Sequence, residues 1–259
     1  MGVVNVTPDS FSDGGDYIDP SVAIAHGFAQ VEEGADILDI GGESTRPGAT
    51  PVGIDEELAR VIPVIEGLRG AGVPLSIDTR NAAIMQAALA AGASIINDVS
   101  ALSHDADSMK IAAQSDAPII LMHAKGTPQD MQDAPHYEDV VVEVFDYLSS
   151  RIDACVEAGI ARERLIVDPG IGFGKTLAHN LALMGQLGRF HQLGCPILLG
   201  ASRKRFIGEL TGTPDPKDRM PGSVAAALAA VAQGVHILRV HDVGPTNQAI
   251  DVWQAIDQG

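Results

Sequence analysis

The chain has 259 residues, of which 46% are hydrophobic, enough for a large buried core, so a disordered protein is excluded. Its formal net charge is −17, with 17 Lys and Arg against 34 Asp and Glu, which argues against a nucleic-acid-binding surface. No stretch approaches the roughly 18 apolar residues that span a membrane. Two cysteines without paired spacing, Cys155 and Cys195, are typical of reduced core thiols in a cytoplasmic protein.

Short apolar runs alternate with longer helical patterns along the whole chain. We predict strands at residues 2–6, 35–40, 74–78, 94–97, 118–122, 164–168, 196–200 and 236–240. We predict helices at residues 21–33, 55–69, 81–91, 107–115, 138–158, 177–192, 221–233 and 246–256. Continuous apolar runs are typical of parallel strands buried on both faces. Eight alternating pairs in a chain near the usual length of about 250 residues predict an α/β fold, a single (β/α)₈ TIM-barrel domain over residues 1–259.

The two kinds of connection differ in length and composition. A glycine closes five of the helical patterns just before the next strand, at Gly34, Gly92, Gly159, Gly194 and Gly234. The strand-to-helix segments are longer and rich in Gly, Pro, Ser and Asp; we expect loops at residues 7–20, 41–54, 123–137, 169–176 and 200–220. This asymmetry indicates that functional residues occupy the carboxyl-terminal mouth of the barrel.

The predicted helix at residues 221–233 is apolar nearly all round. An outer barrel helix normally presents one polar face to water. We therefore expect a second subunit to cover this helix, and predict a homodimer.

Most predicted strands end at a polar residue, and these residues divide by charge. Asp78, Asn97 and Asp168 form a group of hydrogen-bond acceptors that would suit the paired N–H groups of a pterin-like or guanine-like ring. Lys204 would donate to the carbonyl of the same ring. For any one carboxylate, the alternative of a pair with a barrel arginine stays open.

A second group consists of Asn5, Arg46, Arg239 and His241. Two cations, an imidazole and an amide suit a phosphate or diphosphate, with Asn5 placed to join a Mg²⁺ shell. His241 follows Arg239 by two residues, so both side chains lie on one strand face. The basic run at residues 203–205 directly follows a predicted strand, and we expect it at the mouth as well.

The glycine-rich segment at residues 170–176 (GIGFGKT) lacks the first glycine of a nucleotide P-loop, because Pro169 stands there. The loop still permits close backbone approach to a flat ligand, with Phe173 available to stack on it. The remaining histidines show no metal-ligand spacing, and no catalytic triad or dinucleotide-binding motif occurs.

Five motifs in register resemble the dihydropteroate synthase family over essentially the whole chain. They are residues 5–15 (NVTPDSFSDGG), 39–48 (DIGGESTRPG), 168–175 (DPGIGFGK), 202–204 (SRK) and 239–242 (RVHD). The resemblance implies condensation of 7,8-dihydropterin-6-ylmethyl diphosphate with 4-aminobenzoate, giving 7,8-dihydropteroate and diphosphate in folate synthesis. It also implies a Mg²⁺ cofactor held by Asn5.

The resemblance assigns a role to each matching residue. Asp78, Asn97, Asp168 and Lys204 would hold the pterin, with Met122 and Phe173 as neighbours. Thr45, Arg46, Arg239 and His241 would surround the diphosphate, and Phe11, Pro47, Ser202 and Lys204 would border the aminobenzoate. Asp13, Arg46, Lys204, Arg239 and His241 are the expected catalytic residues.

Two departures from the family pattern carry expectations. The residues that usually precede the first strand in this family are missing, so the sequence does not predict the segment that covers the bottom of the barrel. The loop after Asp168 has no extra aromatic residue of the kind inserted in sulfonamide-resistant forms, so we predict inhibition by sulfonamides.

Three other readings compete with this one. A methyltransferase that uses a methylated folate would need the pterin carboxylates but no diphosphate cluster, so Arg46, Arg239 and His241 argue against it. A pterin-binding paralogue without turnover is expected to have lost Arg239, His241 or Lys204, and all are present. A Schiff-base aldolase using Lys204 or Lys175 is the third.

Overall fold

Eight parallel strands form the inner layer of the described chain. The computed structural model describes residues 1–7, 19–44, 49, 51–127 and 129–257. Within these ranges the strands are β1 (Gly2–Asn5), β2 (Leu38–Gly41), β3 (Leu75–Asp78), β4 (Ile95–Asp98), β5 (Ile119–Met122), β6 (Leu165–Asp168), β7 (Leu198–Leu199) and β8 (Ile237–Leu238). Strands β1 to β6 pair in sequence order, and β7 pairs with β8, each pair in parallel.

Isolated parallel bridges join the two sheets into a ring. Val167 on β6 pairs with Ile197, and Gly2 on β1 pairs with Val240. The Val240 N–H donates to the Met1 carbonyl at 3.0 Å, and the Val3 N–H donates to the Val240 carbonyl at 3.1 Å. The last strand is thereby tied to the first, and the predicted barrel is confirmed.

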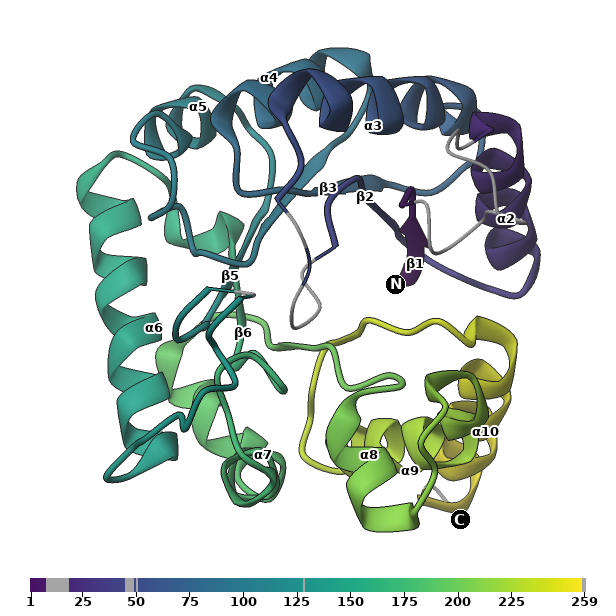
Figure 1. The fold of residues 1–259 in the computed structure, drawn as a ribbon, viewed down its shortest axis with the longest axis vertical. Helices are drawn as coiled ribbons and strands as arrows, with labels where there is room; N and C mark the ends of the chain where they lie inside the picture. The colour runs from purple at the N-terminus through teal and green to yellow at the C-terminus, as the bar shows by residue number, and fades with distance from the viewer. Residues whose placement is uncertain (8–18, 45–48, 50, 128, 258–259) are drawn as a thin grey trace.

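The helices encircle the strands (Figure 1). They are α2 (Pro20–Glu32), α3 (Ile54–Leu68), α4 (Ala82–Ala91), α5 (Ser108–Gln114), α6 (Val140–Glu157), α7 (Leu177–Met184), α8 (Arg205–Thr211), α9 (Met220–Val231) and α10 (Val243–Asp257). The predicted helix at 177–192 was wrong in one respect: α7 ends at Met184, and a 3₁₀ helix, Leu187–Leu193, follows. Gly185 and Gly188 stand at this break, where glycine disfavours a continuous helix.

The segment at 200–220, predicted as a loop, contains the short helix α8. This helix has only seven residues, too few for a hydrophobic period to be recognised, and it ends at Gly212 in the left-handed conformation. The five predicted capping glycines all have positive φ, so the short helix-to-strand turns are as expected.

Side-chain alternation along the strands divides the barrel interior into two levels. A buried apolar level near the amino-terminal ends contains Met1, Ile95, Ile120 and Leu198, with Ile37, Ile166 and Ile237 packed against it. The next inward position on several of these strands is polar, because successive inward side chains are two residues apart. Polar side chains therefore lie above an apolar floor at the carboxyl-terminal mouth. Among the described residues, no helix is both long and apolar enough to cross a membrane.

The opposite strand faces pack against the helices, and this layer should dominate stability. Leu121 on β5 is fully buried there. We expect Leu121→Ala to lower the free energy of unfolding by about 2–5 kcal/mol, because it removes buried apolar contacts and leaves a cavity. Urea denaturation measures the change. Leu210→Ala is the control, since Leu210 is 55% exposed; equal effects of the two substitutions would contradict the packing described here.

Candidate active site

Polar side chains from four strands converge at the mouth of the barrel. A methyl group placed on Gly41 would lie 3.6 Å from Asp78 Oδ2 and 3.8 Å from Asn5 Oδ1. One placed on Gly200 would lie 3.9 Å from both Asp168 Oδ2 and Arg239 Cδ. These two positions therefore border the four side chains, which the sequence analysis expected at one rim. Asp78 and Asp168 of the acidic group therefore lie close to Asn5 and Arg239 of the second group.

Arg239 is held between two carboxylates. Its Nε donates to Asp39 Oδ2 at 2.6 Å, and its Nη2 donates to Asp78 Oδ2 at 2.9 Å. Asp39 is fully buried and also accepts a hydrogen bond from Asn97 Nδ2 at 3.0 Å. The alternative left open by the sequence, a strand-end carboxylate paired with a barrel arginine, is therefore found at Asp78.

The sequence analysis gave Asp39 no role, although this residue begins the motif at residues 39–48. The signal was present, because Asp39 follows the apolar pair Ile37 and Leu38 as Asp78 follows its own strand. Its carboxylate touches both Arg239 and Asn97, so it fixes the guanidinium and the direction of the amide. With Nδ2 turned to Asp39, the Asn97 oxygen is the atom left for other partners.

Burial changes the protonation of the acidic group. It raises the pKa of Asp78 to about 7; the Asp39 charge acts in the same direction, while Arg239 opposes the shift. Burial also raises the pKa of Asp168, against the opposing effect of the Gly170 N–H, which donates to Oδ1 at 2.7 Å. These carboxyls therefore titrate closer to neutrality than exposed ones.

His241 and Ser202 form a contact between the last two strands' loops. His241 Nδ1 lies 3.0 Å from Ser202 Oγ, which also accepts the His241 backbone N–H at 3.2 Å. Burial, followed by Arg239 and Arg203, lowers the pKa of His241 to about 3, so the imidazole is neutral at pH 7. A Ser202 hydroxyl that donates to Nδ1 leaves the ring hydrogen on Nε2, as a donor to an anion.

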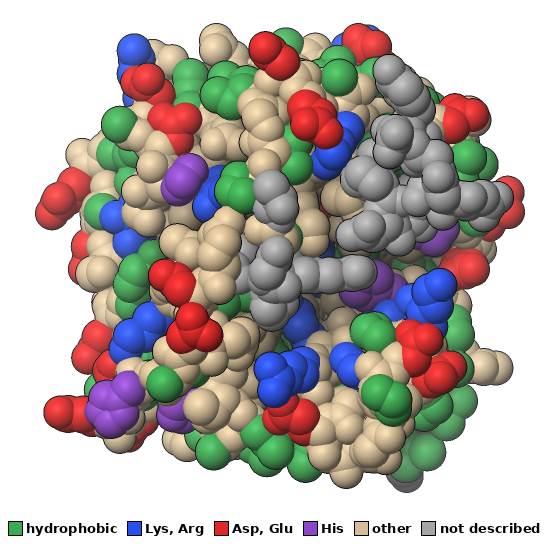
Figure 2. All heavy atoms as spheres, viewed as in Figure 1, with side chains coloured by type: hydrophobic (Ala, Val, Ile, Leu, Met, Phe, Trp, Pro, Cys, Tyr) green, Lys and Arg blue, Asp and Glu red, His purple; other side chains and the backbone are tan. Residues whose placement is uncertain are grey.

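The basic run at residues 203–205 is not a unit. Arg203 pairs with Asp242, and Arg205 pairs with Glu209 on the exposed surface. Lys204 Nζ lies 4.0 Å from the centre of the Phe173 ring, and its charge acts on Asp168. Of the three, Lys204 is the one that joins the acidic side of the mouth. Figure 2, viewed as in Figure 1, shows Lys and Arg side chains, with a histidine beside them, near the middle of the face turned to the viewer.

Buried Lys175 holds the glycine-rich loop together. Its Nζ donates to the carbonyls of Gly170 at 2.8 Å and Phe173 at 3.0 Å, and lies 2.9 Å from His123 Nδ1. Burial lowers the pKa of Lys175 to about 7. Since backbone carbonyls surround this amine, it is not available to form a Schiff base with a carbonyl substrate, which argues against the aldolase alternative at Lys175. A methyl group on Gly170 would collide with the His123 carbonyl, so only glycine permits this packing.

Phe11, Asp13, Thr45, Arg46 and Pro47 lie outside the described residues. Met122 is buried, and its Cγ would lie 3.2 Å from a methyl group on Gly170, so it belongs to the wall beneath the glycine-rich loop. In the part of the chain that the structure describes, no cluster of three His, Cys, Asp or Glu side chains is arranged to hold a metal ion.

Comparison with known proteins identifies the family. Residues 1–241 match the family model described as pterin binding enzyme. The chain belongs to the pterin-binding enzyme family. It is 54% identical over 259 residues to the dihydropteroate synthase of Neisseria meningitidis serogroup C, covering 99% of this chain and 92% of that one.

Solved structures of this family superpose closely. The dihydropteroate synthase of Xanthomonas albilineans with 4-aminobenzoic acid has 54% sequence identity and a TM-score of 0.94, covering 99% of this chain and 92% of that chain. The same enzyme in complex with 7,8-dihydropteroate has 51% identity and a TM-score of 0.90 at the same coverage. The similarity extends over the whole barrel rather than one motif.

Because Asp39 and Arg239 form a buried ion pair, a substitution that removes the charge of Asp39 should destabilise the fold. Asp39→Asn should lower the free energy of unfolding by about 3 kcal/mol, because removing one member of a buried ion pair leaves the other incompletely compensated. Urea denaturation tests this, with the exposed Asp116→Asn as control. A change of less than about 0.5 kcal/mol at Asp39 would show that the pair is not held as described.

Proposed function

We propose that this protein is a dihydropteroate synthase. It would condense 7,8-dihydropterin-6-ylmethyl diphosphate with 4-aminobenzoate, releasing 7,8-dihydropteroate and diphosphate in folate biosynthesis. The main support is the single mouth at which buried acceptors and cationic donors meet, in a chain 54% identical to a dihydropteroate synthase over nearly its full length. The methyltransferase alternative has no use for the cationic donors.

The acidic side suits the pterin ring. Asp168 and the Asn97 oxygen present acceptors to the N–H groups of the ring, and an Asp78 carboxylate adds a third. Lys204 donates to the ring carbonyl from above Phe173. Because the site is buried, a neutral ring that satisfies these acceptors binds better than water does.

The reaction breaks the carbon–oxygen bond to the diphosphate, and the electron pair leaves on oxygen. The electron-rich dihydropterin stabilises the resulting cationic methylene, which the carboxylates of Asp78 and Asp168 support electrostatically. Arg239, Arg46 and neutral His241 take up charge on the departing diphosphate, and Asp13 assists the cation. The arylamine nitrogen then forms the new carbon–nitrogen bond and loses its proton to solvent or to the released diphosphate.

Asn5 is the residue we propose for Mg²⁺. Its amide oxygen lies near Asp78 at the mouth, and an amide oxygen is a ligand that Mg²⁺ accepts. One protein ligand fits a Mg²⁺ that otherwise coordinates the substrate's phosphates and water, as is usual for this ion. When bound, Mg²⁺ would neutralise diphosphate charge and aid its departure.

The aminobenzoate site and the assembly complete the proposal. Phe11, Thr45, Pro47, Ser202 and Lys204 would border the aminobenzoate. The small residues of α9 support a homodimer, since Pro221, Ala225 and Ala229 are exposed on this apolar helix. A cytoplasmic location suits a biosynthetic enzyme with reduced cysteines.

The direct test is diphosphate release from the pterin diphosphate with Mg²⁺ and 4-aminobenzoate. The wild-type protein should form 7,8-dihydropteroate, identified by mass. Asp168→Ala should weaken pterin binding by about 100-fold or more, because it leaves ring donors unpaired in a buried site. Calorimetry measures this loss, with Asp116→Ala as control. Formation of no dihydropteroate by folded wild-type protein would overturn the proposed function.

The raised pKa of Asp78 predicts a pH-dependent affinity. Below pH 7 the protonated carboxyl no longer accepts two hydrogen bonds, so pterin affinity should rise as the pH increases through about 7, where Asp78 loses its proton. Dissociation constants measured from pH 5.5 to 8.5 would show this inflection, at roughly the stated pKa. Asp78→Asn should remove the inflection; its persistence would assign it to another group.

Sulfonamides should inhibit turnover in competition with 4-aminobenzoate. The reason is that the loop after Asp168 has no extra aromatic residue of the kind inserted in sulfonamide-resistant forms. Initial rates at several concentrations of both compounds should give intersecting competitive plots. Normal turnover at inhibitor concentrations well above those of 4-aminobenzoate would contradict this expectation.

A further inference from the structure

Arg203 stands between Ser202 and Lys204 in an unfavourable backbone conformation. Its φ is 58°, in the left-handed region that favours glycine. Such a conformation persists in a non-glycine residue only where the surroundings hold it in place. The proposed reaction gives Arg203 no contact with substrate, so another reason for an arginine here is needed.

Helix α9 and the residue before it hold the backbone of Arg203 on both sides. The Arg203 N–H donates to Ser223 Oγ at 2.8 Å, and that hydroxyl donates to the Arg219 carbonyl at 2.8 Å. The Arg203 carbonyl accepts from Arg219 Nη1 at 3.1 Å. Since Arg219 and Ser223 are both buried, the turn is fixed by groups with little freedom to move.

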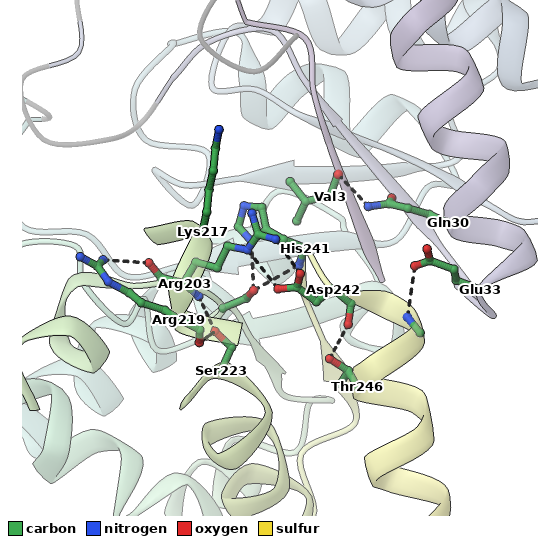
Figure 3. A network of polar contacts seen from close by, with 12 residues as sticks. Val3, Gln30, Glu33, Arg203, Lys217, Arg219, Ser223, His241, Asp242 and Thr246 are labelled. Atoms are coloured by element: carbon green, nitrogen blue, oxygen red, sulfur yellow. Dashed lines mark hydrogen bonds and ion pairs between the residues drawn. The ribbon is translucent and has the colours of Figure 1, made fainter. Parts of the chain in front are cut away.

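The Arg203 side chain reaches the loop after β8. Its Nε donates to Asp242 Oδ2 at 3.0 Å and its Nη2 donates to Asp242 Oδ1 at 2.6 Å, a two-pronged ion pair. Figure 3 shows Arg203 between Arg219 and Ser223 on one side and Asp242 on the other. The contact between His241 and Ser202 lies beside this pair, so the two loops are linked twice.

This double link stands where the strand ladder stops. Strands β7 and β8 have two residues each, and the last backbone bond of their ladder is from the Arg239 N–H to the Leu199 carbonyl at 2.9 Å. Beyond it, Ser202 and Lys204 on one loop and His241 on the other have no shared ladder to set their spacing. The ion pair of Arg203 with Asp242 joins the two loops here.

We infer that Arg203 and Asp242 are positioning residues, which set the distance between Ser202 and Lys204 on one loop and His241 on the other. The inference rests on the proposed function. Neither residue needs to touch the substrates. Because a displacement of about 1 Å at reacting groups can cost about 100-fold in rate, loosening this pair should slow turnover strongly.

Arg203→Gly is the most informative variant. Glycine accepts the left-handed backbone without strain, so the turn and the fold should be retained while the guanidinium is lost. We expect kcat/KM for 4-aminobenzoate to fall by about 10- to 100-fold, with a thermal midpoint near that of the wild type. Asp242→Asn should cause a similar loss. Arg205→Ala, which removes a neighbouring exposed ion pair, is the matched control and should stay within about twofold.

The double variant separates positioning from general damage. If the two residues act only through each other, Arg203→Gly with Asp242→Asn should be no slower than the worse single variant. Multiplied losses, or turnover within about twofold of the wild type for Arg203→Gly, would overturn the inference.

A crystal structure of Arg203→Gly provides a readout that does not depend on activity. The contact between His241 Nδ1 and Ser202 Oγ, 3.0 Å in the parent, should lengthen or break. An unchanged contact would overturn the inference even if the wild type failed to make dihydropteroate. That failure by itself would overturn only the proposed reaction.

Discussion

The site depends on one arginine shared by two buried carboxylates. Arg239 bonds to Asp39 at 2.6 Å and to Asp78 at 2.9 Å, so a single positive charge stabilises an acidic pocket that burial would otherwise neutralise. Burial raises the pKa of Asp78 to about 7, with the Asp39 charge acting in the same direction and Arg239 opposing it. A pocket of this kind suits a ring rich in N–H donors, and a substrate that becomes cationic as its diphosphate departs.

The barrel makes this arrangement possible through the period of its strands. Apolar side chains such as Ile120 and Ile166 fill the interior below, and Met122 and Asp168 stand one inward position above them. The apolar floor excludes water from beneath the polar level, which strengthens every electrostatic contact above it. Closure of the ring then brings Arg239, which follows β8, against carboxylates from β2 and β3.

Much of the fold and of the acidic group was predictable from the sequence, because most strands are short apolar runs that end at a polar residue. Apolar runs ending at Asp78, Asn97 and Asp168 predicted both the barrel and the acidic group. The ion pairs of Arg239 were not predictable, since they depend on which side chains closure of the ring brings together. Helix α8 was missed because its hydrophobic pattern is too short, and Asp39 because nothing in its motif separates a buried anchor from a ligand-binding residue.

The directions of the side chains at residues 203–205 were also not predictable from the sequence. A run of three basic residues reads as one patch, yet a left-handed turn sends the three side chains to Asp242, Phe173 and Glu209. No propensity predicts a positive φ at an arginine; the hydrogen bonds that its backbone makes with Arg219 and Ser223 hold it in place.

Steady-state turnover of Arg239→Lys tests the central claim most directly. Lysine keeps the charge but cannot bond two carboxylates in the planar, forked geometry of a guanidinium. If the shared arginine organises the mouth, kcat/KM for dihydropteroate formation should fall by about 100-fold or more in a folded variant. Turnover within about threefold of the wild type would mean that a positive charge alone suffices, and would contradict the account.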